Sequence, residues 1–206
     1  GFLHKTMFLY VALLAFIFLR EKLTKGLFIG AVLLLAGNYF MLAPDFNFSM
    51  GHIFVISAVV MWAAETTYSK HVLNELSGNV AAFGRMFFGS LFILIFLALS
   101  GRIQMLQGLN FNHFMWIGLT SLFLLMYVIS YYNGLKHVDA SVAACILSLG
   151  APITTALSFV FARKEFSLSQ GFGMLLIISG IASAIWFSTI AAGMKNLFSV
   201  KQNGRN

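Results

Sequence analysis

The chain has 206 residues, of which 60% are hydrophobic and only 9% are charged, and its formal net charge is +7. A soluble domain usually has about 25% charged residues because its surface must be solvated, so this composition excludes water as the main solvent. The thirteen Lys and Arg residues are spread over loops and ends, and they form no basic, aromatic-rich helix face of the kind that binds nucleic acid.

Seven apolar segments of 18 to 23 residues follow one another along the chain. At about 1.5 Å per residue, an α-helix of this length crosses a hydrocarbon core of about 30 Å. The strict alternation of a transmembrane β-barrel is absent, so the pattern predicts an all-α polytopic membrane protein folded as a helical bundle. The expected spans are residues 2–19, 26–43, 51–69, 80–100, 114–133, 140–162 and 171–191.

The first expected span contains Lys5, with His4 beside it. An ionisable group at the bilayer centre costs about 2.5 to 3.5 kcal/mol on insertion scales, so it needs a partner or a function. Lys5 has two interpretations: an interfacial lysine, or a cavity charge that attracts an anion. Gly1 is not an initiator residue and the span has almost no flank, which predicts that the sequence is the C-terminal part of a longer protein.

The third and fourth spans carry Glu65 and Arg85 near the ends that are expected to share one side of the membrane. The two side chains are therefore predicted at nearly the same depth. They form either an interhelical ion pair or a site in which Glu65 acts as a gate or proton-coupling carboxylate. Trp62 lies one turn before Glu65 on the same helix face and is either a cavity residue or a packing residue.

The fifth span places Tyr127 and Tyr131 one turn apart. Their hydroxyl groups and ring faces are suited to a substrate, although anchoring at the membrane interface explains Tyr131 equally well. Both tyrosines are kept as candidate substrate-binding residues.

The sixth span carries a stripe of small or weakly polar residues that should not face lipid. Its members, at steps of 4, 3, 4 and 3, are Ser141, Cys145, Ser148, Pro152 and Thr155. Because Pro152 has no backbone N–H, the carbonyl of Ser148 is predicted to be a free acceptor near the bilayer midplane. The stripe is either a packed kink or a wall of a transport cavity.

An internal repeat relates the first span to the sixth. Residues 8–21 can be laid on residues 152–165 at an offset of 144, and after a slip of one residue two glycines match two others at an offset of 143. These glycines are Gly30 and Gly37, matched to Gly173 and Gly180. Two pairs of small residues four apart are expected to pack helices. They are Gly26 with Gly30, and Gly180 with Ala184.

The repeat divides the chain into four parts. Residues 1–43 would be the last two helices of a first repeat, 44–50 a connecting loop, 51–191 a second repeat of five helices and 192–206 a basic cytoplasmic tail. A repeat with an odd number of spans must be inverted relative to its copy, which is a recurring transporter architecture. The intact protein is expected to have ten helices.

Two stretches resemble the repeat ends of EamA-like transporters in the drug/metabolite transporter superfamily. One is residues 131–141, reading YYNGLKHVDAS, followed by Pro152 and by the cluster at 163–165; the other is residues 18–23, reading FLREKL, followed by the matched glycines. The resemblance implies a ten-helix carrier of two inverted repeats that exports metabolites or amino acids. It also implies an unusual first half, because Phe8 stands where the family has a proline.

The predicted function is a secondary carrier that moves small metabolites, amino acids or drug-like molecules by alternating access. Its partners would be a small-molecule substrate and the lipid bilayer, and proton coupling and a homodimer are both compatible with the sequence. A seven-helix receptor-like or scaffold protein stays open as an alternative. An intramembrane enzyme would need paired carboxylates or a nucleophile with its base, so no catalytic residue, metal site or cofactor is predicted.

The distribution of positive charge predicts the orientation. Eight Lys and Arg residues fall on one set of loops and ends, and four on the other. Because positive segments stay in the cytoplasm, the C-terminus is expected there, in a multi-pass protein of the cell membrane.

Overall fold

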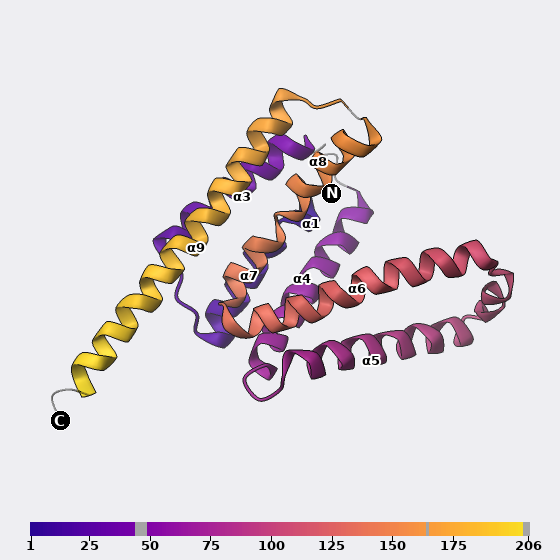
Figure 1. Ribbon diagram of the computed structural model, residues 1–206, viewed down its shortest axis with the longest axis horizontal. Coiled ribbons are helices and arrows are strands. Elements are labelled where there is room, and N and C mark those ends of the chain that lie inside the picture. The colour runs from indigo at the N-terminus through magenta and orange to yellow at the C-terminus, as the bar shows by residue number, and fades with distance from the viewer. Residues whose placement is uncertain (44–48, 164, 204–206) are drawn as a thin grey trace. The chain divides into compact units, whose positions relative to one another are not determined.

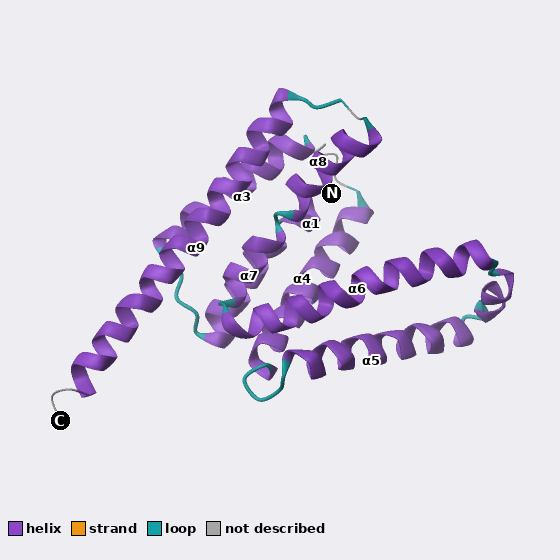
Figure 2. Ribbon diagram, viewed as in Figure 1, coloured by secondary structure: helices purple, strands orange, loops and turns teal. Residues whose placement is uncertain are grey.

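The computed structural model describes residues 1–43, 49–163 and 165–203. Every regular element in these residues is a helix, as the colouring of Figure 2 makes plain, and the predicted all-α class is confirmed. The elements are α1 (Phe2–Lys5), α2 (Met7–Leu14), the π-helix η1 (Ala15–Leu19), α3 (Lys25–Leu42), α4 (Met50–Val72), α5 (Gly78–Leu99), the 3-10 helix η2 (Ile103–Gly108), α6 (Phe111–His137), α7 (Ala140–Leu147), α8 (Gly150–Ala162) and α9 (Leu168–Asn203).

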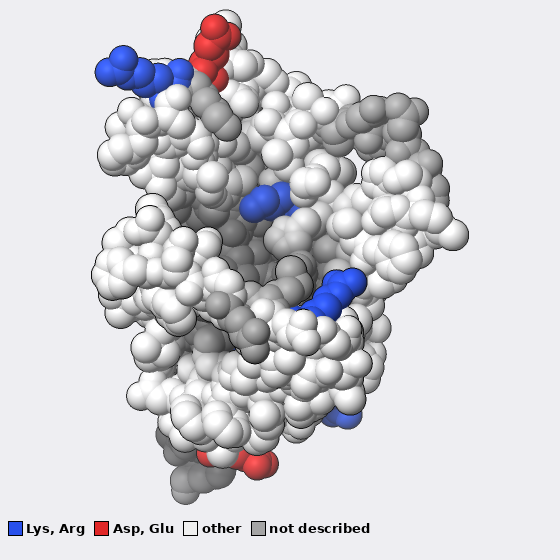
Figure 3. Space-filling view, turned by 90° about the vertical axis from the view of Figure 1, so that its right-hand side faces the viewer, with Lys and Arg blue, Asp and Glu red and all other residues white. Residues whose placement is uncertain are grey.

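Seven helical segments in the described residues are long and apolar enough to cross a membrane, which confirms the predicted number. They are Phe2–Leu19, Lys25–Leu42, Met50–Val72, Gly78–Leu99, Phe111–His137, Ala140–Ala162 and Leu168–Thr189. Their ends differ from the predicted ones by at most four residues. The face drawn in Figure 3 carries few charged side chains, separated by broad uncharged surface, as a lipid-exposed protein requires.

Polar caps determine where several spans begin. The Asn110 side chain accepts a hydrogen bond from the His113 N–H at 3.1 Å, and the His113 ring in turn contacts the Asn110 N–H at 3.2 Å. This reciprocal cap satisfies N–H groups that lack a partner within the helix. It starts α6 at Phe111, three residues before the predicted start of this span. Thr24 caps α3 through a 3.2 Å hydrogen bond from the Leu27 N–H.

The chain forms two compact units. The first comprises Gly1–Tyr68 and Asp139–Asn206, and the second comprises Ser69–Val138. In the first unit α3 runs along α9 over much of its length, and α2 packs against α7 (Figure 1). In the second unit α5 and α6 form an antiparallel hairpin joined by η2.

Glycines bring α3 and α9 into backbone contact. A Cβ atom at Gly30 would lie 2.7 Å from the Gly180 carbonyl oxygen and 3.2 Å from the Ala184 Cβ, and Gly26 lies directly against Phe187. Small residues permit this approach because no side chain separates the two backbones. The predicted packing role of both small-residue pairs is therefore confirmed.

Candidate functional site

The first group of predicted site residues lies on α1 and α4, in the first unit. Lys5 is the last residue of α1 and is half-buried. Trp62, on α4, is 43% exposed. Its ring meets the ring of His4 edge-on, with centroids 5.1 Å apart and an interplanar angle of 86°. The neighbour of Lys5 thus makes an aromatic contact of favourable geometry with α4.

Glu65 is half-buried on α4, one turn after Trp62. The two residues that follow it, Thr66 and Thr67, are buried, and the Thr67 hydroxyl donates to the Ala63 carbonyl at 2.9 Å. Neither threonine was predicted as a site residue. Glu65 belongs to the first unit and Arg85 to the second, so the predicted ion pair between them stays a prediction.

The sixth span is interrupted where the sequence predicted. Helix α7 ends at Leu147 and α8 begins at Gly150. The prediction of a free carbonyl at Ser148 is wrong, because the N–H of Ala151 donates to it at 3.2 Å. The backbone forms a tighter turn before Pro152. In this turn the residue three positions after Ser148 supplies the N–H that the proline lacks.

Most of the stripe on the sixth span is buried. Ser141, Cys145 and Ser148 are 3%, 1% and 5% exposed; Pro152 is buried, and Thr155 is half-buried. Helix α7 contacts α2, α3 and α9. The prediction that this face does not point at lipid is thus confirmed for α7. A cavity wall made by Ser148, Pro152 and Thr155 stays a prediction.

Glu21 is a polar residue that the sequence analysis did not single out. Its Oε1 accepts a hydrogen bond from the Ala140 N–H at 2.6 Å, and its Oε2 accepts from the Ser141 hydroxyl at 2.6 Å and the Ser141 N–H at 3.2 Å. Arg20, in a left-handed conformation with φ 56°, turns the chain at the end of η1 just before it. A carboxylate from a distant segment therefore caps α7, where unpaired N–H groups and the helix dipole favour negative charge.

Tyrosines and one arginine form a row in the second unit. Arg85 donates from Nη1 to the Tyr132 hydroxyl at 3.2 Å, and its guanidinium carbon lies 5.9 Å from the centroid of that ring. Tyr131 meets Tyr132 edge-on at 5.4 Å, and Tyr127 stacks on Tyr131 at 5.9 Å. The predicted pair of tyrosines thus extends through the buried Tyr132, which the sequence analysis missed, to a cation.

Phenylalanine at Tyr132 tests the polar end of this row. Tyr132→Phe removes the acceptor for Arg85 but keeps the ring, so we expect a loss of about 1 kcal/mol in the free energy of unfolding. Unfolding by a denaturing detergent, followed by circular dichroism, measures it. The matched change Tyr68→Phe, at a 70% exposed tyrosine, should leave stability unchanged, and equal losses in both variants would contradict the assignment.

Two lysines fasten the open end of the α5–α6 hairpin, opposite η2. Lys70 donates to the carbonyls of Leu135 and Lys136 at 2.8 and 3.1 Å. Lys136 donates back to the Leu76 carbonyl at 3.1 Å. Lys70 thereby satisfies the last carbonyls of α6 and complements its dipole, whereas Lys136 fastens the turn that follows α4. Both lysines have a structural role besides their place in the charge pattern.

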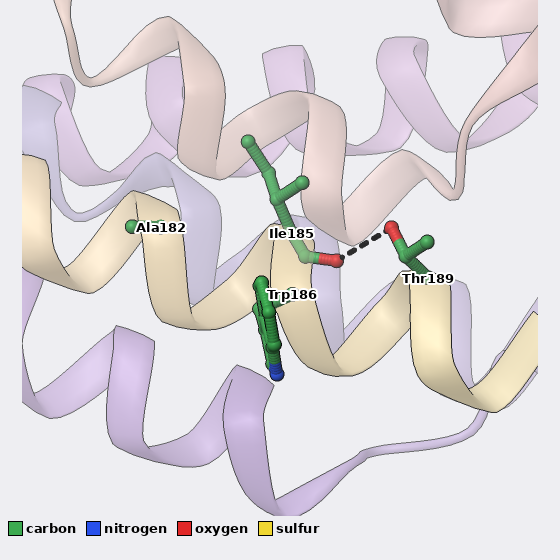
Figure 4. Close-up of a pocket in the computed structure, with 4 residues that line it drawn as sticks. All are labelled: Ala182, Ile185, Trp186 and Thr189. Carbon is green, nitrogen blue, oxygen red and sulfur yellow. Dashed lines mark hydrogen bonds between the residues drawn. The ribbon is translucent and has the colours of Figure 1, made fainter.

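A shallow pocket of about 400 Å³ lies on α9 (Figure 4). It is lined by Ala182, Ile185, Trp186 and Thr189, which share one helix face, and the Thr189 hydroxyl donates to the Ile185 carbonyl at 3.0 Å. This internal hydrogen bond satisfies the hydroxyl and leaves an almost wholly apolar lining, so none of the predicted site chemistry lies here. In the described part of the chain, no three His, Cys, Asp or Glu side chains gather as metal ligands.

Sequence comparisons relate the chain to membrane transporters. A sequence model described as the EamA-like transporter family matches residues 49–186. An uncharacterized transporter of Methanothermobacter thermautotrophicus is 23% identical over 190 residues, which are 86% of this chain and 53% of that protein. The uncharacterized transporter YetK of Bacillus subtilis is 26% identical over 191 residues, which are 88% of this chain and 57% of YetK. The chain spans about half the length of these curated relatives.

Proposed function

The chain belongs to the EamA-like transporter family, and we propose that it forms the larger part of a secondary carrier working by alternating access. The substrate would be a small metabolite, an amino acid or a drug-like molecule. The family and the seven apolar helices make it an integral, multi-pass membrane protein.

Features that recur at an offset of 143 residues support two repeats. Arg20 ends the first span with φ 56°, and Arg163 ends the sixth with φ 49°. The hydroxyls of Thr24 and Ser167, each just before the next helix, both accept a hydrogen bond from a backbone N–H at its start. The π-helix η1 accounts for the slip from 144 to 143, because a π-turn accommodates one extra residue in a helix.

The observation that carries the proposal is a crosswise contact between equivalent glycines. Gly30 in α3 lies against Gly180 in α9, and Gly37 in α3 lies against Gly173 in α9. In the repeat, Gly173 is the counterpart of Gly30 and Gly180 is the counterpart of Gly37. Equivalent positions meet crosswise when a two-fold axis passes between two copies of one element. This favours inverted repeats related about an axis between α3 and α9, with residues 1–43 ending the first repeat and 51–191 forming the second. Carriers of this kind rock one half against the other.

The substrate site would be built from the residues that the sequence singled out. The cavity residues of this proposal are Lys5, Trp62, Glu65, Tyr127, Tyr131, Ser148, Pro152 and Thr155. Glu65 would couple transport to protons, with Arg85 as its gating partner, and a homodimer remains part of the prediction. The excess of positive charge on one set of loops favours a cytoplasmic C-terminus in the cell membrane.

Counterflow in proteoliposomes tests the carrier. The full-length protein, loaded with unlabelled amino acids, nucleosides or amphipathic cations, should show saturable exchange of one class with external radiolabelled substrate. Protein-free liposomes provide the control. No exchange for any class, from protein shown to be folded by circular dichroism, would contradict the proposal for these substrates and favour the receptor-like or scaffold alternative.

A further inference from the structure

A carboxylate from one proposed repeat fastens the first turn of a helix in the other. Glu21 follows the first span, within residues 1–43, and α7 lies within residues 51–191. We propose that Glu21 is a gating residue, whose contact with Ala140 and Ser141 latches the cytoplasmic end of the carrier closed. This inference rests on the proposed function and orientation.

The chemistry of the contact suits a latch. All three hydrogen bonds are accepted by one charged group, and two are only 2.6 Å long. Hydrogen bonds to an ionised acceptor are roughly twice as strong as neutral ones. Two donors are N–H groups in the first turn of α7, which have no partner within their own helix. Separation of the two segments breaks all three hydrogen bonds at once, so together these bonds stabilise the closed state.

The position that corresponds to Glu21 in the second repeat holds a different kind of side chain. The sequence alignment at an offset of 144 pairs Glu21 with Glu165, but the left-handed residues Arg20 and Arg163 place the offset at 143 by this point, so the structural counterpart of Glu21 becomes Lys164. A lysine side chain has donors but no acceptor, so it cannot hold a helix N-terminus in this way. The Glu21 latch stabilises the state in which the cytoplasmic end is closed. Loss of Glu21 therefore shifts the carrier toward its cytoplasm-open state.

The chain contains its own reporter of the latch. Cys145, its single cysteine, lies one turn after Ser141 on α7 and is only 1% exposed. While Glu21 holds the first turn of α7, a thiol reagent on the cytoplasmic side cannot reach this sulfur. When the latch opens, the face of α7 that carries both residues becomes accessible, so the rate of Cys145 alkylation measures opening.

The experiment uses full-length protein in inside-out vesicles, with any cysteine that precedes Gly1 changed to serine, and a membrane-impermeant maleimide. Glu21→Ala should raise the rate of Cys145 labelling at least tenfold. Glu21→Gln, which keeps one neutral acceptor, and Ser141→Ala, which keeps both N–H donors, should raise it about threefold. If Glu21→Ala does not fold, these two variants test the inference in its place. Glu165→Ala, at an exposed glutamate beside Lys164, should leave the rate unchanged.

A second reporter separates a latch from local loosening. In right-side-out vesicles, the same reagent reaches Thr155→Cys, combined with Cys145→Ser, from the outer face. Opening of the cytoplasmic side closes the outer side in alternating access, so Glu21→Ala should slow outer labelling about threefold. An outer rate that is unchanged or raised would reduce Glu21 to a structural cap, and an unchanged Cys145 rate would overturn the inference. Neither assay measures transport, so either failure is distinct from an absence of substrate exchange.

Discussion

Leucine in place of Gly30 should sharply lower the thermal stability of the protein. The Cβ of any residue there would lie 2.7 Å from the Gly180 carbonyl oxygen and 3.2 Å from the Ala184 Cβ, and neither atom belongs to a flexible side chain. Relief requires α3 and α9 to move apart along much of their shared length. Overpacking costs about 1 to 3 kcal/mol, and we expect Gly30→Leu to reach or exceed the upper value. Thermal unfolding in detergent, followed by circular dichroism, measures the change.

Gly118 offers a matched control on α6. A Cβ at Gly118 would meet nothing within 4 Å, so Gly118→Leu adds the same side chain to open space and should change the midpoint little. An equal loss in both variants would show that leucine destabilises any span and would contradict the special role of the α3–α9 contact. Gly30→Ala, which adds only the Cβ, should fall between the two.

The spans could be predicted because membrane insertion is a local, additive property. A run of apolar residues crosses the bilayer whatever it later contacts, so hydropathy located all seven segments. Some of the errors at the starts of the spans come from polar caps. His113, which completes the cap of α6, lies outside the apolar run and reads as loop until its hydrogen bonds with Asn110 are seen.

The long-range contacts could not be predicted, because no periodicity encodes them. Glu21 and Ala140 are 119 residues apart, and Arg85 and Tyr132 are 47 residues apart. The carbonyl of Ser148 shows a different limit. Proline removes one donor, and the sequence indicates that loss correctly, but it does not reveal that the backbone tightens to bring in the N–H of Ala151. The π-helix at Ala15–Leu19, which would account for the one-residue slip in the proposed repeat, was likewise not visible in the sequence.

Glutamine in place of Glu65 should abolish the part of transport that a pH gradient drives. Glu65 is a half-buried carboxylate inside a span, followed by two buried threonines, and intramembrane carboxylates of this kind often serve as proton relays. Glutamine keeps the size of the side chain but cannot take up or release a proton. We expect uptake driven by a pH gradient to fall at least tenfold in Glu65→Gln, whereas counterflow at equal pH persists, because exchange needs no net proton movement.

The two arms of this experiment discriminate between roles for Glu65. Both are measured in the same proteoliposomes, with the pH gradient as the only difference, and Glu75→Gln, at an exposed glutamate outside the spans, is the control. Loss of both arms would mean that Glu65 is needed for the fold or for substrate binding, as an interhelical ion pair with Arg85 would require. Retention of both would place proton coupling on another residue. Only the selective loss of gradient-driven uptake identifies Glu65 as the coupling group, because removing a purely structural carboxylate would impair exchange and net transport alike.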